Sequence, residues 1–156
     1  MNIFILDTNF KNNAEYYCDQ HLVKMILESA QILCTVSHMK GVEATYKPTH
    51  KNHPCVQWVA ENGSHWDLLV ELSTALNDEY KKRFNHSNNH KSFDVISQLT
   101  KPMYHNNDFK GIFCSVTDEV RRTGVIDTIM LYREYYKNKS KEINMRWTGR
   151  VQPHWM

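Results

Sequence analysis

Glycine is scarce in the sequence, and no glycine-rich phosphate loop is present. Only five of the 156 residues are glycine. Neither G-x-G-x-x-G nor G-x-x-x-x-G-K occurs, the patterns that let backbone N–H groups approach phosphates in Rossmann and P-loop proteins. The sequence therefore gives no indication of a dinucleotide or P-loop site, and we expect no cofactor.

Cysteine is also sparse, with four residues and no C-x-x-C pair. Cys18 and Cys34 would lie over about four turns apart on one helix, which is too far for a disulfide. Together with Cys55 and Cys114 they are expected to be reduced, packed thiols, which is typical of a reducing compartment. We therefore expect a cytoplasmic protein.

Long apolar runs and a large net charge are absent. No apolar run approaches the roughly 20 residues that a membrane span needs, and the start MNIFILDTNF lacks the basic region of a signal peptide. The net charge is +2, with nine histidines, whereas a dedicated duplex-DNA binder usually has a larger basic excess. The composition predicts no membrane partner and a small anionic footprint or a local basic pocket.

Apolar residues recur at helical spacing over most of the chain, which predicts an all-α fold. Without an internal repeat or a long linker, residues 1–156 are expected to form one compact helical domain. It would have two long helices, a third C-terminal helix and an irregular aromatic tail. The expected elements are a strand or extended arm at Ile3–Leu6, helices from Asn12 or Asn13 to about His38, from Pro54 to about Phe84 with a bend at Gly63, at Phe93–Leu99 and at Ile126–Lys139, and a turn at Thr117–Glu119.

The first long helix carries a narrow polar strip on an otherwise apolar surface. At about 100° of rotation per residue, five polar side chains fall within an arc of about 80°. The other sides of the helix are apolar, so protein is expected to wrap around it. The five residues of the strip are His21, Lys24, Glu28, Gln31 and Thr35.

Two interpretations of this strip remain open. In the first, it is the solvated side of an amphipathic helix, and Lys24 and Glu28 form an ordinary i,i+4 surface pair. In the second, it lines a cleft in which Glu28 is partly desolvated and acts as an acid or base, while His21 and Lys24 contact an anion. A Glu28 carboxylate on the open exterior would rule out the second interpretation.

A basic loop is expected to lead into the second long helix, which would begin at Pro54. Free backbone N–H groups at a helix start, with basic side chains just before them, form a seat for a phosphate. The alternatives are a solvated loop and a metal site built from His21 and two loop histidines. The metal site lacks a cysteine or carboxylate at ligand spacing, so no metal is expected. The candidate loop residues are Thr49, His50, Lys51, Asn52 and His53.

Aromatic and basic residues gather in the last part of the chain. They are Tyr132, Tyr135, Tyr136, Trp147 and Trp155, with Arg133, Arg146 and Arg150. Such side chains can stack on bases and hold phosphates, or they can form the core at a junction between a helix and a tail. Trp147, flanked by Arg146, is the best candidate for contact with a base or ligand.

The string DQHL, with a glutamate nine positions after its aspartate (Asp19 and Glu28), resembles the phage pyrimidine-dimer DNA glycosylase family of the endonuclease V type. HPCVQWVAENGSHWDLLVELSTALNDEYKKRFN looks like that family's long second helix, and RWTGRVQPHWM is similar to its aromatic, basic tail. The chain also resembles a subgroup of small phage proteins that begin MNIF.LD and carry a PTHKNHP loop. The resemblance implies an all-α N-glycosidase in which Glu28 activates the nucleophile and stabilises the cationic sugar, with His21 as the motif histidine.

The chain departs from that family at its N-terminus. The family's nucleophile is the α-amine of a threonine that is exposed when the initiator methionine is removed. Here Asn2 follows Met1 and is expected to block that removal, and extra residues precede DQHL. The amine is therefore expected to stay on Met1 or to lie far from Glu28, which argues against Schiff-base formation and an associated lyase activity.

Three hypotheses follow. The first is an N-glycosidase that cleaves a base–sugar bond. Its substrate would be either a cyclic oligonucleotide immune signal, which would make it an anti-defence protein in an infected bacterial cell, or DNA with pyrimidine dimers. The modest charge and the missing nucleophile favour the small nucleotide. The second is a protein that sequesters a nucleotide without cleaving it, and the third is a partner-binding module that uses the aromatic tail. A homodimer is compatible with each. The predicted catalytic residues are Glu28 and His21, and the predicted substrate contacts are Lys24, Gln31, Thr49, His50, Lys51, Asn52, His53, Arg146 and Trp147.

Overall fold

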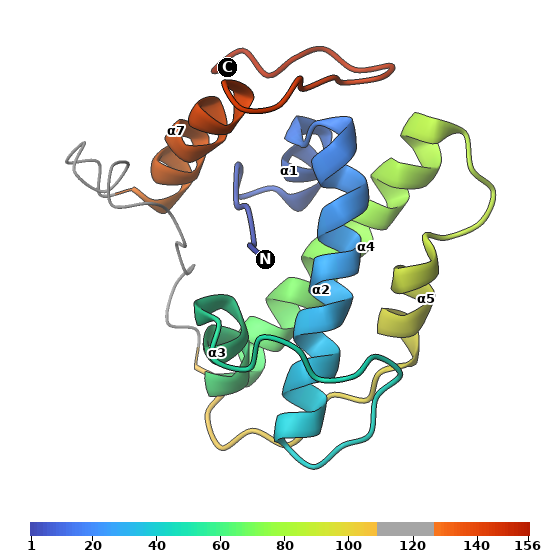
Figure 1. Ribbon diagram of the computed structural model, residues 1–156, viewed down its shortest axis with the longest axis vertical. Helices are drawn as coiled ribbons and strands as arrows, with labels where there is room; N and C mark the ends of the chain where they lie inside the picture. The colour runs from blue at the N-terminus through green and yellow to red at the C-terminus, as the bar shows by residue number, and fades with distance from the viewer. Residues whose placement is uncertain (109–126) are drawn as a thin grey trace.

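The computed structural model describes residues 1–108 and 127–156, and within them helices and loops make up the chain, which confirms the predicted all-α fold (Figure 1). Within the same residues no helix is long and apolar enough to cross a membrane. The helices are α1 (Phe10–Tyr16), α2 (Asp19–Met39), α3 (Pro54–Glu61), α4 (Gly63–Phe84), α5 (Lys91–Gln98) and α7 (Thr128–Ser140).

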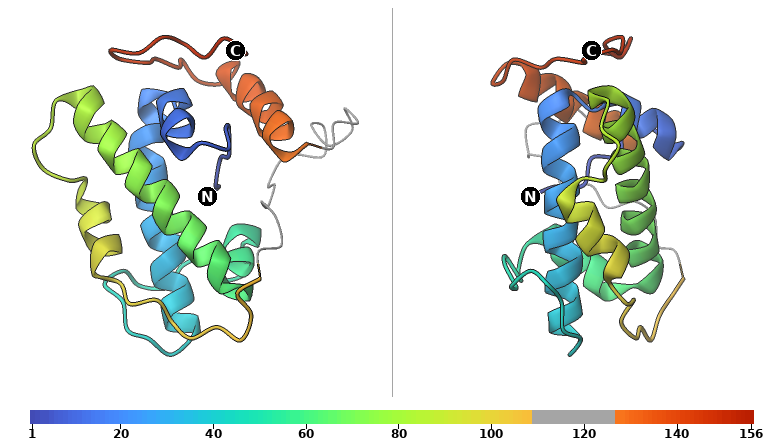
Figure 2. Two further views of the ribbon diagram at one scale, coloured as in Figure 1. Left: turned by 180° about the vertical axis from the view of Figure 1, so that it is seen from behind. Right: turned by 90° about the vertical axis from the view of Figure 1, so that its right-hand side faces the viewer.

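The two long helices, α2 and α4, form the centre of the fold. They pack on each other, α3 and α5 pack against α2, and α1 packs against α4. Seen from behind, α4 runs diagonally across α2, and α7 lies at the end of the molecule that also holds α1 (Figure 2). Apolar side chains from both long helices are nearly inaccessible and build the core: Leu22, Ile26, Leu33, Leu69, Leu72 and Leu76.

The predicted first long helix is in fact broken between α1 and α2. Tyr17 and Cys18 have extended backbones, with ψ angles of 134° and 161°. Groups from distant parts of the chain satisfy the backbone donors that the break frees. Cys18 N donates to the Tyr136 hydroxyl at 2.8 Å, and Asp19 N donates to the Arg146 carbonyl at 2.8 Å. These partners make the break stable, and the local apolar pattern does not contain them.

The bend predicted at Gly63 is a complete break between α3 and α4. Asn62 leaves the helical region, and its side chain caps α4 by accepting a hydrogen bond from Ser64 N at 2.9 Å. Gly63 N donates to the Asn106 carbonyl at 3.0 Å, and a Cβ at position 63 would clash with the Asn107 side chain. The Asn107 side chain would therefore have to move to make room for a larger residue at this position.

The other predicted elements agree with the structure where it describes them. The helices α5 and α7 begin and end within two residues of the predicted bounds. The loop before α3 and the tail after α7 are irregular, as predicted. Cys18, Cys34 and Cys55 are buried, as expected for packed residues. Cys114 and the turn predicted at Thr117–Glu119 lie outside the described residues.

Residues 1–6 form an extended arm, one of the two forms predicted for this run, and the arm lies between α2 and α7 (Figure 1). The side chains of residues 3 to 6 are buried. Side chains of α1 and its C-terminal flank bind the arm's backbone, since no neighbouring strand is present in the described residues to do so. The Asn13 amide bonds to Leu6 N and to the Phe4 carbonyl, which also accepts a hydrogen bond from the Tyr17 hydroxyl at 2.6 Å. These contacts fix the arm in one place.

A buried ionic network attaches the tail to the helices. Arg83 on α4 has an inaccessible side chain and binds Glu79 at 2.9 Å and Asp19 at 3.2 Å. Arg150 in the tail binds both oxygens of Glu79, at 2.9 and 2.7 Å. Burial alone would raise the pKa of Glu79, but hydrogen bonds from Arg150 and Arg83 outweigh it and hold the pKa below its usual range. The Thr148 hydroxyl also donates to Asp19, at 2.7 Å, so the aspartate of the DQHL string holds the tail.

Replacing Arg83 by methionine is expected to lower the free energy of unfolding by about 3–5 kcal/mol, because the buried carboxylates lose a cation that they depend on. Urea unfolding followed by circular dichroism measures the loss. Lys82→Met changes an exposed neighbour on the same helix and should shift the free energy by less than about 0.5 kcal/mol. Equal losses in the two variants would contradict the role of the network.

Candidate active site

Glu28 lies on α2 and is 7% exposed, so its carboxylate is buried rather than on the open exterior. Lys24 Nζ lies 3.5 Å from Glu28 Oε1, one helical turn away. The other oxygen, Oε2, accepts a hydrogen bond from Asn2 N at 2.9 Å and lies 3.6 Å from the α-amino group of Met1. The i,i+4 pair therefore exists, but its acidic partner is buried and paired on both oxygens, unlike an ordinary surface pair.

The position of the α-amino group corrects one expectation from the sequence. The amine is on Met1, but it is not far from Glu28: the two groups are 3.6 Å apart. Glu28 follows Asp19 by nine positions on α2, a distance of about 13 Å along the helix. The extra residues before DQHL give the arm the length to run back over this distance and to bring its end to the carboxylate (Figure 1).

The rest of the polar strip divides between solvent and the loop before α3. The Lys24 side chain is 63% exposed, and Gln31 is half-buried. Thr35 is buried, and its hydroxyl accepts a hydrogen bond from Thr49 N at 3.1 Å. This bond ties the loop to α2 two turns beyond Glu28, so the strip and the loop lie on the same side of the molecule.

The start of α3 is capped from within the loop. Pro54 is the first residue of the helix, as predicted, and His53 Nδ1 accepts a hydrogen bond from Cys55 N at 3.2 Å. The next two N–H groups, of Val56 and Gln57, donate to the His53 carbonyl at 2.9 and 3.0 Å. The prediction that free backbone N–H groups at the start of this helix bind a phosphate is therefore wrong, and a phosphate here would be held by side chains. Because Nδ1 accepts, Nε2 carries the proton of the neutral ring and is a donor.

His50 occupies a strained backbone conformation within the same loop. Its φ of 50° lies in the left-handed region, which is uncommon for a residue other than glycine. The Thr49 hydroxyl lies 2.6 Å from His50 Nδ1, and the His50 carbonyl accepts a hydrogen bond from His53 N at 2.8 Å. Strain of this kind is kept where surrounding contacts over-determine the backbone, and it is frequent in functional loops. Lys51 and Asn52 are exposed between the two histidines.

The charges around Glu28 affect the pKa of His53 in the loop before α3. Burial lowers the pKa of His53, and the α-amino group of the chain and His50 lower it further, while Glu28 opposes them. Glu28, Lys24 and the Met1 α-amino group are called the Glu28 cluster below. The structure thus brings a buried carboxylate together with cationic groups from the arm and from α2, and Thr35 ties the loop to the same helix.

A family model described as pyrimidine dimer DNA glycosylase matches residues 1–92. The chain belongs to this family. Neither a curated protein nor a solved structure matches the chain. The matched segment contains the arm, α1 to α4 and the loop before α3, and therefore every group of the Glu28 cluster described above. The predicted family is confirmed, while α7 and the tail lie outside the matched segment.

His21, the histidine of the DQHL string, lies in an aromatic cluster in this member of the glycosylase family. Its ring centre is 5.2 Å from that of Phe4 and 5.1 Å from that of Tyr136, and the residue is 9% exposed. Burial is the main cause that lowers its pKa to about 4, and Lys24 and Lys139 add to the effect. His21 is therefore neutral at neutral pH, and its predicted contact with an anion would be a hydrogen bond without a positive charge.

The neutral His21 is expected to make the stability of the protein depend on pH. Between pH 6.5 and about pH 4 the unfolded chain takes up a proton at His21 and the native protein does not, so the free energy of unfolding falls as the pH falls. The loss attributable to this residue is about 3 kcal/mol across that window. Denaturant unfolding of the wild type and of His21→Phe measures it, and the variant should have the shallower pH dependence. Parallel curves would contradict the assignment.

Arg146 and Trp147 lie at the start of α2. Trp147 Nε1 donates to the Tyr16 carbonyl at 2.9 Å, and the Arg146 carbonyl accepts from Asp19 N. The start of α2 is about 13 Å along the helix from Glu28, so the structure does not bring these two residues to the carboxylate. Their contact with a ligand stays a prediction. Two of the other C-terminal aromatic residues are fully buried and belong to the core, as the second interpretation held: Tyr132 and Tyr136.

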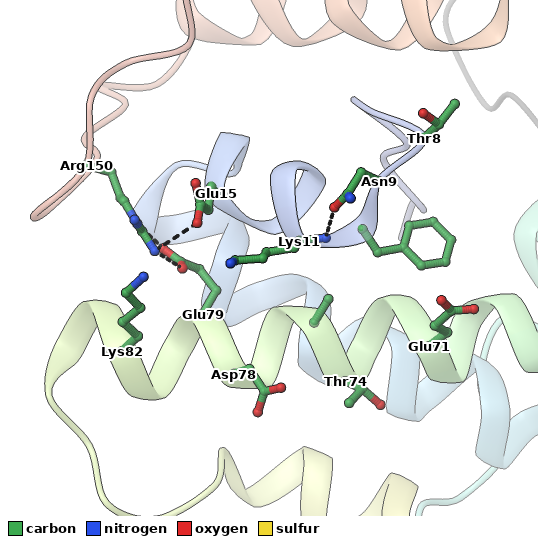
Figure 3. A pocket seen from close by; sticks show the side chains of 12 residues that line it. Thr8, Asn9, Lys11, Glu15, Glu71, Thr74, Asp78, Glu79, Lys82 and Arg150 are labelled. Atoms are coloured by element: carbon green, nitrogen blue, oxygen red, sulfur yellow. Dashed lines mark hydrogen bonds and ion pairs between the residues drawn. The ribbon is translucent and has the colours of Figure 1, made fainter.

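A separate pocket of about 830 Å³ lies between α1 and α4 (Figure 3). Arg150 and Lys82 line it together with acidic side chains of both helices. Arg150 already binds Glu15 at 3.1 Å and Glu79 at 2.7 Å, so these three charged side chains of the pocket hold the tail. Glu28 does not line it. The cleft predicted over Glu28 stays a prediction.

The metal alternative has no support in the described part of the chain. Among residues 1–108 and 127–156, no group of three histidine, cysteine, aspartate or glutamate side chains is placed to hold a metal ion. His21 belongs to the aromatic cluster, whereas His50 and His53 belong to the loop that Thr35 ties to α2.

Sequence analysis did not identify Asn2 and Tyr132 as parts of this site. Asn2 N binds Glu28, and Asn2 Oδ1 accepts a hydrogen bond from the Tyr132 hydroxyl at 3.2 Å. The available signal was the apolar run Ile3–Leu6 directly after a polar Asn2. Such a run must be buried, but the run itself does not indicate against which helices it packs.

Proposed function

We propose that this protein is an N-glycosylase that breaks the bond between base and sugar at damaged pyrimidines in DNA. The α-amino group of Met1 is the nucleophile, and Glu28 accepts its proton. The observation that supports this most directly is the 3.6 Å separation between the amine and buried Glu28 Oε2. A nucleophile beside a base is the arrangement that covalent catalysis needs, and membership of the pyrimidine dimer DNA glycosylase family supports the reaction class.

The amine attacks in its neutral form, after Glu28 Oε2 has taken its proton. Its lone pair forms a bond to C1′ of the sugar while the C1′–N bond to the base breaks. The electron pair of that bond leaves with the base, which takes up a proton. After a second proton leaves nitrogen, the nitrogen lone pair forms the C=N bond while the C1′–O4′ bond breaks and O4′ takes up a proton, which gives a protonated imine between Met1 and C1′. The carboxylate stabilises the positive charge on the sugar and on the protonated imine.

The imine also reopens the question of lyase activity. An imine at C1′ makes the C2′–H bond more acidic, so that β-elimination of the 3′ phosphate becomes accessible. The expectation against a lyase step depended on an amine that stays on Met1 or lies far from Glu28; the amine is on Met1, but it lies 3.6 Å from Glu28 Oε2. We infer that strand cleavage follows base removal in this protein.

Phosphates on either side of the reacting sugar are held by the loop and by α2. Lys24 presents an exposed ammonium one turn from Glu28. His53 offers an Nε2–H donor, and His50 and Lys51 are exposed beside it. Charge-assisted bonds from such groups to phosphate oxygens are stronger than neutral ones, so a few of them position the sugar over the amine.

A small nucleotide is the second candidate substrate, and the net charge of +2 is the observation that favours it. Binding of a long duplex relies on neutralising many phosphates, whereas a cyclic oligonucleotide presents only a few. In this version the protein removes a base from an immune signal and acts as an anti-defence protein in an infected bacterial cell. The same carboxylate and loop would serve both substrates.

Borohydride reduction separates the candidates. With duplex DNA that contains a pyrimidine dimer, reduction is expected to give a covalent adduct that mass spectrometry locates on the N-terminal peptide. Such an adduct would refute the small-nucleotide version. Base released from a panel of cyclic dinucleotides, without an adduct on DNA, would instead identify the second candidate as the substrate. Intact ligand recovered from the denatured complex, with no base released from either substrate, would show sequestration.

A further inference from the structure

Two residues of α7 hold the N-terminal arm from the side opposite α1. Arg133 Nε donates to the Leu6 carbonyl at 2.8 Å, and its Nη2 lies 3.4 Å from Asp7 Oδ2. Near the other end of the arm, the Tyr132 hydroxyl donates to Asn2 Oδ1 at 3.2 Å. Consecutive residues of α7 therefore contact the arm at both of its ends.

The contact between Tyr132 and Asn2 bears directly on the amine. Asn2 Oδ1 also accepts a hydrogen bond from Ile3 N at 2.8 Å, which holds the side chain against its own backbone. In this conformation Asn2 N points at Glu28 Oε2, 2.9 Å away, and the amine of the preceding residue reaches the same oxygen. Tyr132 is fully buried, so its ring has little freedom to move. A fixed hydroxyl thus determines where the end of the arm lies.

The helix that carries this hydroxyl lies outside the segment that matches the family. The match ends at residue 92, and α7 spans Thr128–Ser140. Glu28 and the basic loop come from the matched segment, whereas part of the support for the amine comes from the C-terminal region. The two regions therefore complete one site.

We propose that Tyr132 is a positioning residue that holds the α-amino group at Glu28 through Asn2. This inference rests on the proposed function, in which that amine is the nucleophile. The hydroxyl acts on geometry, and a displacement of about 1 Å between reacting groups can reduce a rate about 100-fold. Without the hydroxyl, the side chain of Asn2 rotates and the end of the arm moves away from the carboxylate.

Tyr132→Phe tests the proposal, with Tyr136→Phe as the matched control. Both tyrosines are fully buried on α7, and each substitution removes one hydroxyl and leaves the ring. The Tyr136 hydroxyl accepts from Cys18 N at the start of α2 rather than binding the end of the arm. The two variants lose comparable buried hydrogen bonds, so their losses of stability should be similar.

Reductive methylation with formaldehyde and cyanoborohydride, in the absence of nucleic acid, reports on the amine. Peptide mass spectrometry compares the methylation rate at Met1 with that at exposed Lys82 in the same molecule. Tyr132→Phe should raise the relative rate at Met1 by up to about tenfold, because a hydrogen bond that keeps the amine on Glu28 is lost. Tyr136→Phe should leave it near the wild-type value. Equal rates at Met1 in the two variants would overturn the proposal.

The yield of the borohydride adduct on dimer-containing DNA should fall in Tyr132→Phe, whereas the methylation rate at Met1 should rise. The adduct yield should fall about tenfold or more in Tyr132→Phe and stay near the wild-type value in Tyr136→Phe. A purely structural role would lower the yield equally in both variants. If the wild type gave no adduct, the proposed chemistry of the amine would fail, and the methylation rates would still decide whether Tyr132 holds the amine.

Asn2→Leu provides a second test, because it removes the partner of the Tyr132 hydroxyl and keeps a bulky second residue that retains Met1. It should raise the methylation rate at Met1 as Tyr132→Phe does. The double variant should show no further increase, since both substitutions break the same link. Additive effects would show that Tyr132 and Asn2 act independently and would overturn the proposed route.

Discussion

Glu28→Gln is expected to lower the rate of base release by about 10²- to 10⁴-fold, the range for loss of a general acid–base partner. Glutamine keeps the shape of the side chain, but it cannot take a proton from the Met1 amine or offset positive charge on the sugar. Binding should be retained, because Lys24 and the loop before α3 supply the phosphate contacts. Single-turnover rates at saturating substrate and equilibrium titrations with labelled substrate measure the two effects separately.

Glu79→Gln is the matched control for this experiment. Glu79 is also buried, at 5% exposure, and it is also paired with two cations, Arg83 and Arg150. The substitution should lower the melting temperature but leave the release rate per folded molecule unchanged, since the network holds the tail. If both variants lost activity only in proportion to their loss of stability, Glu28 would be a structural residue and the proposed mechanism would be wrong.

The fold could be predicted where helical signals are local. Long apolar repeats marked the two central helices and α7, and Pro54 marked the start of α3. The break at Cys18 could not be predicted, because the hydroxyl that stabilises it belongs to Tyr136, far along the chain. Gly63 did indicate a break, since glycine is disfavoured within helices, but the close approach of the Asn107 side chain to it is a tertiary contact.

The distinction between local signals and tertiary contacts also applies to the site. Glu28 could be predicted as a candidate, because its carboxylate belongs to a narrow polar strip on a helix with many apolar residues. The position of the Met1 amine could not, because an extended arm packs wherever side chains such as Asn13 and Tyr17 satisfy its backbone. The environment of His21 could not be predicted for a related reason: aromatic neighbours from distant segments bury the ring, and burial lowers its pKa to about 4.

Two extra residues before Met1 are expected to reduce the borohydride adduct by about 100-fold or more, since misplacement of a nucleophile by even 1 Å is costly. Two residues of extended chain span about 7 Å, and the Met1 side chain is only 4% exposed, so the added residues have no room beside Glu28. The new amine must therefore lie away from the carboxylate. A fusion cut by a protease to leave Gly-Ser before Met1 provides the sample, and the intact mass of the adduct gives its yield.

The same fusion cut directly before Met1 is the control and should give the full adduct yield. Loss of the adduct with residual base release would show that Glu28 can activate water when the amine is displaced, since a buried base next to the sugar does not depend on the identity of the nucleophile. An adduct at full yield in the extended protein would have to lie on another amine. Lys24 Nζ, 3.5 Å from Glu28 Oε1, would then take the place of Met1, and peptide mapping of the adduct distinguishes the two because they lie on different proteolytic fragments.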